Sequence, residues 1–141
     1  MSILALDLGR RRVGVAISHG IAASTLKPLF FDERSPGAFY RELEEIIELQ
    51  KVEKIVIGLP LGRLGKETAQ GRWTRERARE ISVRLHLPVS FAEESFSSFQ
   101  AKENLKRVKP KKLARRHAIL DSESAKVILE QYLHESRRSS L

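Results

Sequence analysis

The sequence predicts an α/β fold in which a mixed β-sheet of about five strands, the first three antiparallel, is flanked by α-helices. Three short apolar runs come before the first stretch with helical periodicity, and later apolar runs alternate with helical stretches. Closely spaced strands at the start favour hairpin pairing, whereas strands separated by helices favour parallel crossovers. The predicted order βββαβαβαα therefore places both kinds of pairing in one sheet.

The antiparallel part begins with a buried strand over residues 2–7 that ends in Asp7. Gly9 and the basic triplet after it predict a tight turn into a second strand over residues 13–17, so the two strands form a hairpin. A third strand is expected over residues 26–31. Pro28 indicates an edge strand or the start of a strand, because proline cannot donate a hydrogen bond to a neighbouring strand.

Helices and further strands follow. Ser35 and Pro36 predict the N-cap and first turn of a helix, whose apolar residues recur at helical spacing: Phe39, Leu43, Ile46, Ile47 and Leu49. The next segments are a buried strand over residues 54–59, a Gly/Pro loop over 60–65, a helix over 68–85 and a strand over 88–92.

Two helices complete the chain. Ser97 or Ser98 caps the first, and Asp121 begins the second, which carries its apolar residues at positions 125, 128, 129, 132 and 133. We expect one domain over residues 1–135 and a polar, frayed tail over residues 136–141.

Length and composition exclude several classes of protein. The chain has 141 residues, the length of one compact domain, and it contains no cysteine. Disulfide scaffolds, thiol catalysis and Cys-ligated metal sites are therefore excluded. No apolar run approaches the roughly 18 residues of a membrane span, and Asp7 interrupts the N-terminal apolar stretch before a signal peptide could form. We expect a soluble, cytoplasmic protein without a membrane partner.

The charge of the chain indicates a polyanionic partner. Lys and Arg number 26 against 18 Asp and Glu, which gives a net charge of +8. Such a surplus favours nucleic acid through phosphate contacts and counterion release. Residues 102–116 hold eight basic residues and one acid, a net charge of +7. A solvated basic loop is the alternative interpretation of this segment.

Acidic residues stand where elements of the predicted sheet end or begin. Asp7 ends the first strand, Glu93 and Glu94 end the last strand, and Asp121 opens the final helix. Sites in α/β sheets collect at the C-terminal ends of strands, and converging carboxylates repel one another unless a cation lies between them. Mg²⁺ or Mn²⁺ suits such oxygen ligands. Two ions roughly 3.5–4 Å apart can activate water and stabilise the leaving oxygen of a phosphodiester.

Each acid also has a purely structural interpretation. Asp7 can cap the turn at Gly9, Asp121 can serve as a helix N-cap, and Glu93 with Glu94 can form an exposed strand end. Only their joint placement favours a metal site.

Basic residues and glycines near these acids are the candidates for phosphate binding. Arg10, Arg11 and Arg12 follow Asp7 directly, and arginine can make bidentate contacts to phosphate. Backbone N–H groups at Gly62 and Gly65 could approach a phosphate closely, and a plain turn is the alternative there. The cations that flank these glycines are Arg63 and Lys66.

Two further segments are candidates for contact with nucleic acid. Trp73 lies in an arginine-rich predicted helix and either stacks on a base or belongs to the core. A basic arm before Asp121 would deliver the nucleic-acid backbone to the acids; its residues are Lys109, Lys111, Lys112, Arg115 and Arg116.

Four motifs, in order along almost the whole chain, resemble those of the YqgF (RuvX) family. The opening block DLG, followed by RRVGVAIS, resembles the family's DxGxKRxGVAxS, and GLPL followed by Gly65 resembles its GLPxxxxG loop. The block EESFSS, followed by Ala101, lies where the family carries DERLTTxxA. The ending from Asp121 onward matches DxxAAxxxLxxYL.

This resemblance implies an RNase H-like fold, a bacterial cytoplasmic location and nuclease activity. Members of the family process the 5′ end of pre-16S rRNA, and they resemble Holliday junction resolvases. The resemblance further implies that Asp7, Glu94 and Asp121 are catalytic metal ligands. Glu93 stands where the family has aspartate, so it is a further candidate ligand. Serine replaces the family's arginine at position 95, and Ser124 stands where related resolvases place a fourth acid.

Three functions remain open on the sequence. The favoured one is a metal-dependent endonuclease that uses two Mg²⁺ or Mn²⁺ ions on structured RNA or on branched DNA. The second is a nucleic-acid-binding relative with weak catalysis, which the altered block at residues 93–98 favours. The third is a kinase or ATPase of the related actin-like fold, although such enzymes generally need a duplicated domain. A monomer and a homodimer are equally compatible with the sequence.

Overall fold

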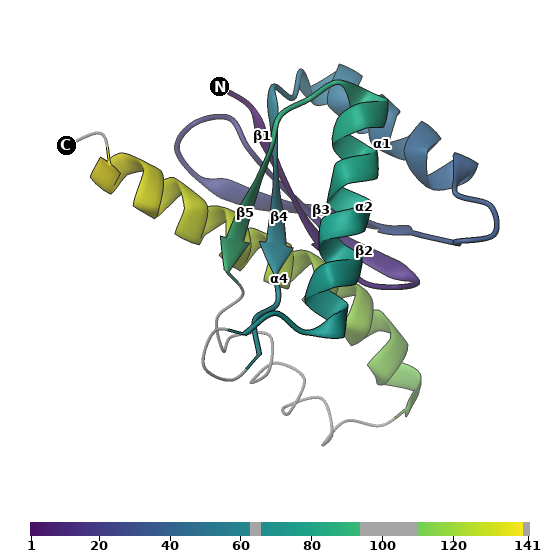
Figure 1. Cartoon of the computed structure of the whole chain (residues 1–141). Helices are drawn as coiled ribbons and strands as arrows, with labels where there is room; N and C mark the ends of the chain where they lie inside the picture. The colour runs from purple at the N-terminus through teal and green to yellow at the C-terminus, as the bar shows by residue number, and fades with distance from the viewer. Residues whose placement is uncertain (63–65, 94–109, 140–141) are drawn as a thin grey trace.

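The computed structural model describes residues 1–62, 66–93 and 110–139, and for residues 110–121 and 138–139 it describes the backbone alone (Figure 1). Within these ranges five strands form one sheet in the order β3-β2-β1-β4-β5. They are β1 (Ile3–Leu8), β2 (Arg12–Ser18), β3 (Ala23–Phe30), β4 (Lys54–Leu59) and β5 (Val89–Glu93).

The pairing of the strands confirms the predicted mixed sheet. β2 pairs antiparallel with β1 and with β3, whereas β1 with β4 and β4 with β5 are parallel. β3 is an edge strand, which confirms the position inferred from Pro28. β3 begins at Ala23, three residues before the predicted start, because its pairing with β2 continues to Ser18.

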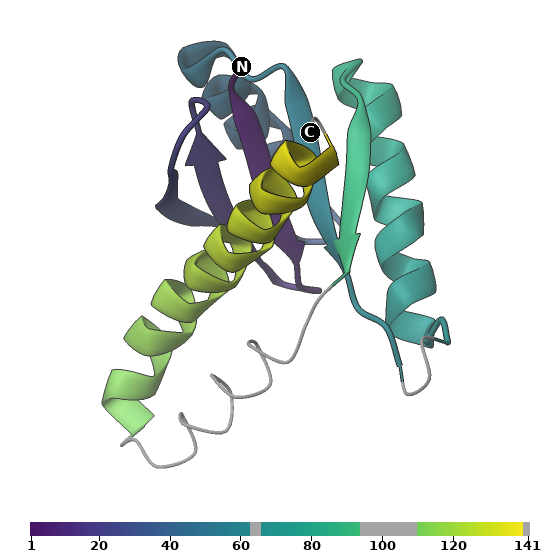
Figure 2. The same ribbon diagram turned by 90° about the vertical axis from the view of Figure 1, so that its left-hand side faces the viewer.

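Helices cover both faces of the sheet (Figures 1 and 2). α1 (Gly37–Gln50) and α2 (Ala69–Leu85) lie on one face, and α4 (Pro110–Ser139) crosses the other. Alternation along β1 produces two cores, because successive side chains of a strand point to opposite faces. Leu4 and Leu6 pack with residues of α1 and α2, while Ile3 and Ala5 pack with residues of α4.

The start of α1 differs from the prediction. Pro36, not Ser35, occupies the N-cap position, and no side chain caps the helix. The Ser35 N–H instead donates to the Asp32 carbonyl in a preceding turn. Leu49 is 79% exposed, because it lies six residues after Leu43 and so outside the i, i+3, i+4, i+7 stripe that faces the core.

The start of α4 also differs from the prediction, and this difference bears on function. The helix begins at Pro110 rather than at Asp121, and it continues past residue 135 to Ser139. Proline is favoured in the first turn of a helix, where its missing N–H has no partner to lose. Asp121 therefore lies inside a long helix, and the N-cap interpretation of this residue is wrong. The predicted helix after Ser97 or Ser98 lies outside the described residues.

Ser122 links α4 to the sheet through a buried hydrogen bond. It is 3% exposed, and its Oγ donates a hydrogen bond of 2.6 Å to the Leu26 carbonyl of β3. From there Ala125, Ile128 and Leu129 bury the helix against the sheet. No helix in the described part of the chain is long and apolar enough to cross a membrane.

Candidate active site

The C-terminal ends of β1, β4 and β5 lie at one edge of the sheet, because the three strands are parallel. Asp7 is the next-to-last residue of β1 and is partly buried. It has the same parity as Ile3 and Ala5, so it lies on the face that α4 covers. The buried run before it fixes the strand, and hence the direction in which this carboxylate points.

Small neighbours surround Asp7 in the sheet. Its register partner on β2 is Gly14. On the other side Gly58 follows Ile57, the β4 partner of Leu6. Glycine has no side chain, so both flanks of the carboxylate leave room on the α4 face. Small neighbours of this kind are compatible with a hydrated divalent ion beside the carboxylate, because such an ion keeps several of its waters.

The structure brings position 121 toward the same edge. α4 runs antiparallel to β1, as Figure 2 shows. Ala5 and Ala125 belong to one core cluster. Asp7 lies two residues beyond Ala5 along β1, and Asp121 lies four residues before Ala125 along α4, one helical turn away. Asp7 and position 121 are therefore both displaced toward the C-terminal end of β1.

The structure does not bring Glu93 to Asp7. Glu93 ends β5 and is exposed. Ala92 packs in the α4-side cluster and Val89 in the opposite cluster, so alternation places Glu93 on the face of α1 and α2. Glu94 lies outside the described residues. Within the described part of the chain, no group of three or more His, Asp or Glu residues is placed to hold a metal ion.

The basic turn between β1 and β2 is held tightly. The Gly9 N–H donates to the Arg12 carbonyl at 2.9 Å. A Cβ at position 9 would lie 2.4 Å from that oxygen, so only glycine fits without a backbone shift. Arg11 is exposed, whereas Arg12 is a partly buried residue of β2. Arg10 is exposed as well, so Arg10 and Arg11 are both more accessible to a phosphate than Arg12.

Arg10 makes a contact that the sequence did not predict. Its guanidinium lies over the Trp73 ring, 5.0 Å from the ring centre. Trp73 belongs to the core on the α1 and α2 face, away from Asp7. Its ring is 9% exposed and its Nε1 donates to Glu33 at 2.9 Å. The core interpretation of Trp73 is therefore correct, and base stacking on it is excluded in this arrangement.

Gly62, after β4, is held by a hydrogen bond within the chain. The Gly62 N–H donates to the Lys66 carbonyl at 2.8 Å, so it is occupied within the turn. A Cβ at Gly62 would lie 2.8 Å from the Thr68 Cγ2 atom, which shows how closely the turn packs on the start of α2. Lys66 is exposed. Arg63 and Gly65 lie outside the described residues.

The predicted basic arm is largely helical. Lys111, Lys112, Arg115 and Arg116 lie in the first turns of α4, whereas the sequence predicted that the helix begins only at Asp121. Lys109 lies outside the described residues. One surface feature was missed at the sequence level: Phe91 of β5 is 38% exposed beside two arginines of α2. Its alternation with Ala92 was the signal that could have revealed it.

Known proteins resemble the chain at two levels. The model of the RuvX family, described as Holliday junction resolvase, matches residues 1–135. A protein of Maridesulfovibrio salexigens named "Putative pre-16S rRNA nuclease" is 38% identical over 133 residues, covering 94% of this chain and 98% of that protein. A protein of the same name from Sulfurihydrogenibium is 36% identical over 137 residues, covering 93% and 88%.

Solved structures share the fold. The RuvC structure from Thermus thermophilus aligns with a TM-score of 0.54 at 13% identity, covering 96% of this chain and 97% of that one. The fowlpox virus resolvase, solved with Holliday junction DNA, aligns with a TM-score of 0.54 at 11% identity, covering 96% and 98%. These similarities confirm the predicted RNase H-like architecture.

Proposed function

The chain belongs to the RuvX (YqgF) family of nucleases, and from that premise we propose that it is a metal-dependent endonuclease that processes the 5′ end of pre-16S rRNA. One observation carries the proposal: Asp7 stands on the α4 face at the end of β1, flanked by glycine on β2. Asp121 lies one helical turn before Ala125, which packs in the same cluster as Ala5 of β1, and this supports a place for Asp121 near Asp7.

The residues of the site fit a hard divalent ion. Asp7, Glu94 and Asp121 would supply oxygen ligands, which Mg²⁺ and Mn²⁺ prefer. When bound, two such ions would supply an activated water and a stabilised leaving oxygen for hydrolysis of a phosphodiester. The backbone at Asp7 is held in place, because β1 is paired on both sides, with β2 and with β4. Preorganised ligands of this kind need no reorganisation during the reaction.

Cations around this edge would hold the substrate strand. Arg11 and Lys66 are exposed on the two loops that follow β1 and β4. Arg12, Arg63 and the basic segment of residues 109–116 would add phosphate contacts. Arg10 would act indirectly, because its place on Trp73 anchors the turn that carries Arg11. The Gly9 turn keeps that anchor close to Asp7, three residues along the chain.

Two other functions compete with this proposal. Similarity to Holliday junction resolvases favours branched DNA as substrate, but the solved junction enzymes are only 11–13% identical. Relatives that carry the rRNA nuclease name are 36–38% identical over nearly the whole chain, so we favour rRNA. The altered block around Glu93 and Ser95 favours a weakly catalytic binder.

A cleavage assay separates these functions. Purified protein is incubated with a pre-16S rRNA leader and with a four-way DNA junction, each with Mg²⁺, Mn²⁺ or EDTA. The proposal predicts cleavage of the leader at one end with either metal and none with EDTA. Cleavage of the junction alone would assign the resolvase function. Tight binding of RNA without cleavage in either metal would assign the binder.

A further inference from the structure

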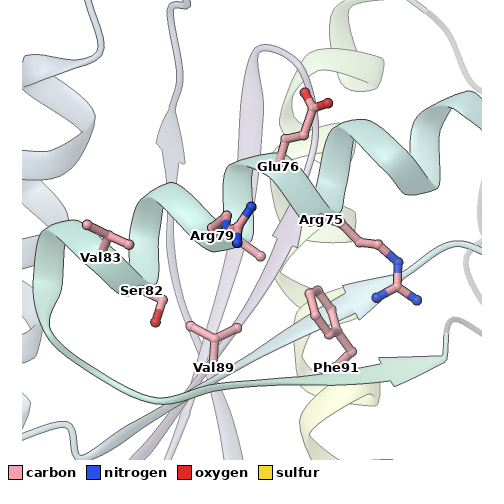
Figure 3. Close-up of a pocket in the computed structure, with 8 residues that line it drawn as sticks. Arg75, Glu76, Arg79, Ser82, Val83, Val89 and Phe91 are labelled. Atoms are coloured by element: carbon pink, nitrogen blue, oxygen red, sulfur yellow. The ribbon is translucent and has the colours of Figure 1, made fainter.

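A groove of about 550 Å³ runs between α2 and β5, on the face of the sheet opposite α4 (Figure 3). Arg75 and Arg79 of α2 line it from one side, and Val89 and Phe91 of β5 from the other. Val83 extends the apolar part along the helix. Neither the sequence motifs nor the proposed active site on the α4 face accounts for this groove.

The apolar wall of the groove faces solvent. Phe91 is 38% exposed and Val83 is 69% exposed. β5 is the last strand in the sheet order, so within the described residues no strand covers its outer edge. Phe91 and Val83 thus form an apolar strip beside an open strand edge, whose unpaired backbone groups can contact a partner.

The charge of the groove is positive. Arg75 and Arg79 lie one helical turn apart, about 6 Å along the axis, and both are exposed. Glu76 also lies at the rim, but its side chain points away from β5 (Figure 3). The Arg75 guanidinium lies over the Phe91 ring, 5.2 Å from its centre, and its Nε forms a salt bridge with Glu67 outside the lining. The lining itself holds two arginines and one glutamate, a formal charge of +1.

An aromatic ring beside a row of cations is the chemistry of a single-strand nucleic-acid platform. Bases stack on rings and on guanidinium planes, while cations bind the phosphates. A second copy of this chain is a poorer occupant, because a twofold contact would set the same arginines against each other. Phe91 of the groove lies two residues before the end of β5, at the edge where the parallel strands β1, β4 and β5 end.

We propose that the groove between α2 and β5 binds single-stranded nucleic acid that flanks the cleaved segment. Arg75 and Arg79 contact successive phosphates, and a base stacks on the pair formed by Phe91 and Arg75. The inference extends the proposed nuclease function and rests on it for the identity of the strand. Binding in the groove needs no metal ion, so it can be measured separately from cleavage.

Fluorescence anisotropy tests the cations. The probe is a fluorescein-labelled oligouridine of about 12 nucleotides, with EDTA present. The double variant R75Q/R79Q should flatten the slope of log affinity against log salt by about 1.4, since each phosphate contact to a single strand contributes about 0.7. The matched control R41Q/R84Q also removes two exposed arginines, neither of which lines the groove, and should keep the slope. Equal slopes in the two variants would overturn the proposal.

A conservative change tests the ring. Phe91→Leu should weaken binding at least about fivefold, the lower end of the cost of losing one stacked base. Phe30→Leu is the control, because Phe30 is a 67% exposed ring on the opposite edge strand, and it should bind as wild type does. Thermal melts establish that each variant is folded. Equal affinities of the two variants would contradict the stacking role.

Sedimentation velocity distinguishes the other occupant. If the wild type is dimeric and R75Q/R79Q is monomeric, the groove is an interface between copies and the proposal is wrong. Failure of the nuclease function has a different signature: no substrate is cleaved, yet R75Q/R79Q still flattens the salt slope. If the substrate is cleaved but R75Q/R79Q leaves the salt slope unchanged, only the proposal for the groove is overturned.

Discussion

Replacing Ser122 by alanine should weaken both the fold and the active site, by separable amounts. The change removes the 2.6 Å hydrogen bond to the Leu26 carbonyl at a position that is 3% exposed. A buried hydrogen bond of this kind contributes about 1 kcal/mol to the free energy of unfolding. For a chain of this length that corresponds to a fall in Tm of about 2–4 °C.

The effect on activity follows from the neighbour of Ser122. Asp121 precedes it in α4, so a looser attachment of the helix displaces a proposed metal ligand. A loss of 1 kcal/mol leaves nearly all molecules folded if stability is about 5 kcal/mol or more. Any loss of cleavage therefore reports a displacement of Asp121 and not unfolding. We expect this loss to be on the order of tenfold, as for the loss of a group that supports a metal ligand.

The assay is urea unfolding paired with single-turnover cleavage of the pre-16S leader. Ser24→Ala is the control, because Ser24 is exposed on the same strand as Leu26. Equal midpoints for Ser122→Ala and Ser24→Ala, with equal cleavage rates, would refute the role of this hydrogen bond in placing α4.

Three further predictions follow from the site and from the core. Glu93→Gln should leave the cleavage rate within about threefold of wild type, because Glu93 lies on the face opposite Asp7 and an exposed carboxylate there contributes little. A loss as severe as that of Glu94→Gln would indicate that both residues belong to one metal shell. Changing Lys111 and Lys112 to alanine should weaken binding to all sequences alike and flatten the salt slope by about 1 for each lost contact, and an unchanged slope would make them a solvated helical face. Burial, with the Glu80 carboxylate adding to it, raises the pKa of Tyr40 above its ordinary 10.0. The folded state thus retains the proton longer than the unfolded state, so stability should fall as pH rises from about 10 through the raised pKa; Tyr40→Phe should remove this fall in alkaline urea melts.

The sheet could be predicted from the sequence because its strands are short, apolar and separated by strong turn signals. β4 was placed at Lys54–Leu59, and the structure has the same bounds. The candidate acid Asp7 was placed at the end of a strand for the same reason. Periodicity read along one segment is sufficient for such features, because they depend on neighbours in the sequence.

Features that depend on contacts between distant segments could not be predicted. The place of Arg10 on Trp73 is set by the packing of α2 against the first turn, 63 residues away in the sequence. The occupied N–H of Gly62 requires the chain to fold back at Lys66. The start of α4 at Pro110 was not predicted, because a proline followed by a run of basic residues resembles a loop. In the structure these residues form the first turns of the helix.

The most direct test of the account is the metal dependence of cleavage by Asp7→Asn. This change removes a carboxylate ligand and keeps the side-chain volume, so the fold and the binding of RNA in EDTA should match those of wild type. Because loss of a group behind a ligand already costs about 10–100-fold, loss of the ligand itself should reduce Mg²⁺-dependent cleavage of the pre-16S leader by at least about 100-fold. Cleavage by Asp7→Asn at the wild-type rate, with the wild-type dependence on Mg²⁺, would contradict a metal site at the end of β1.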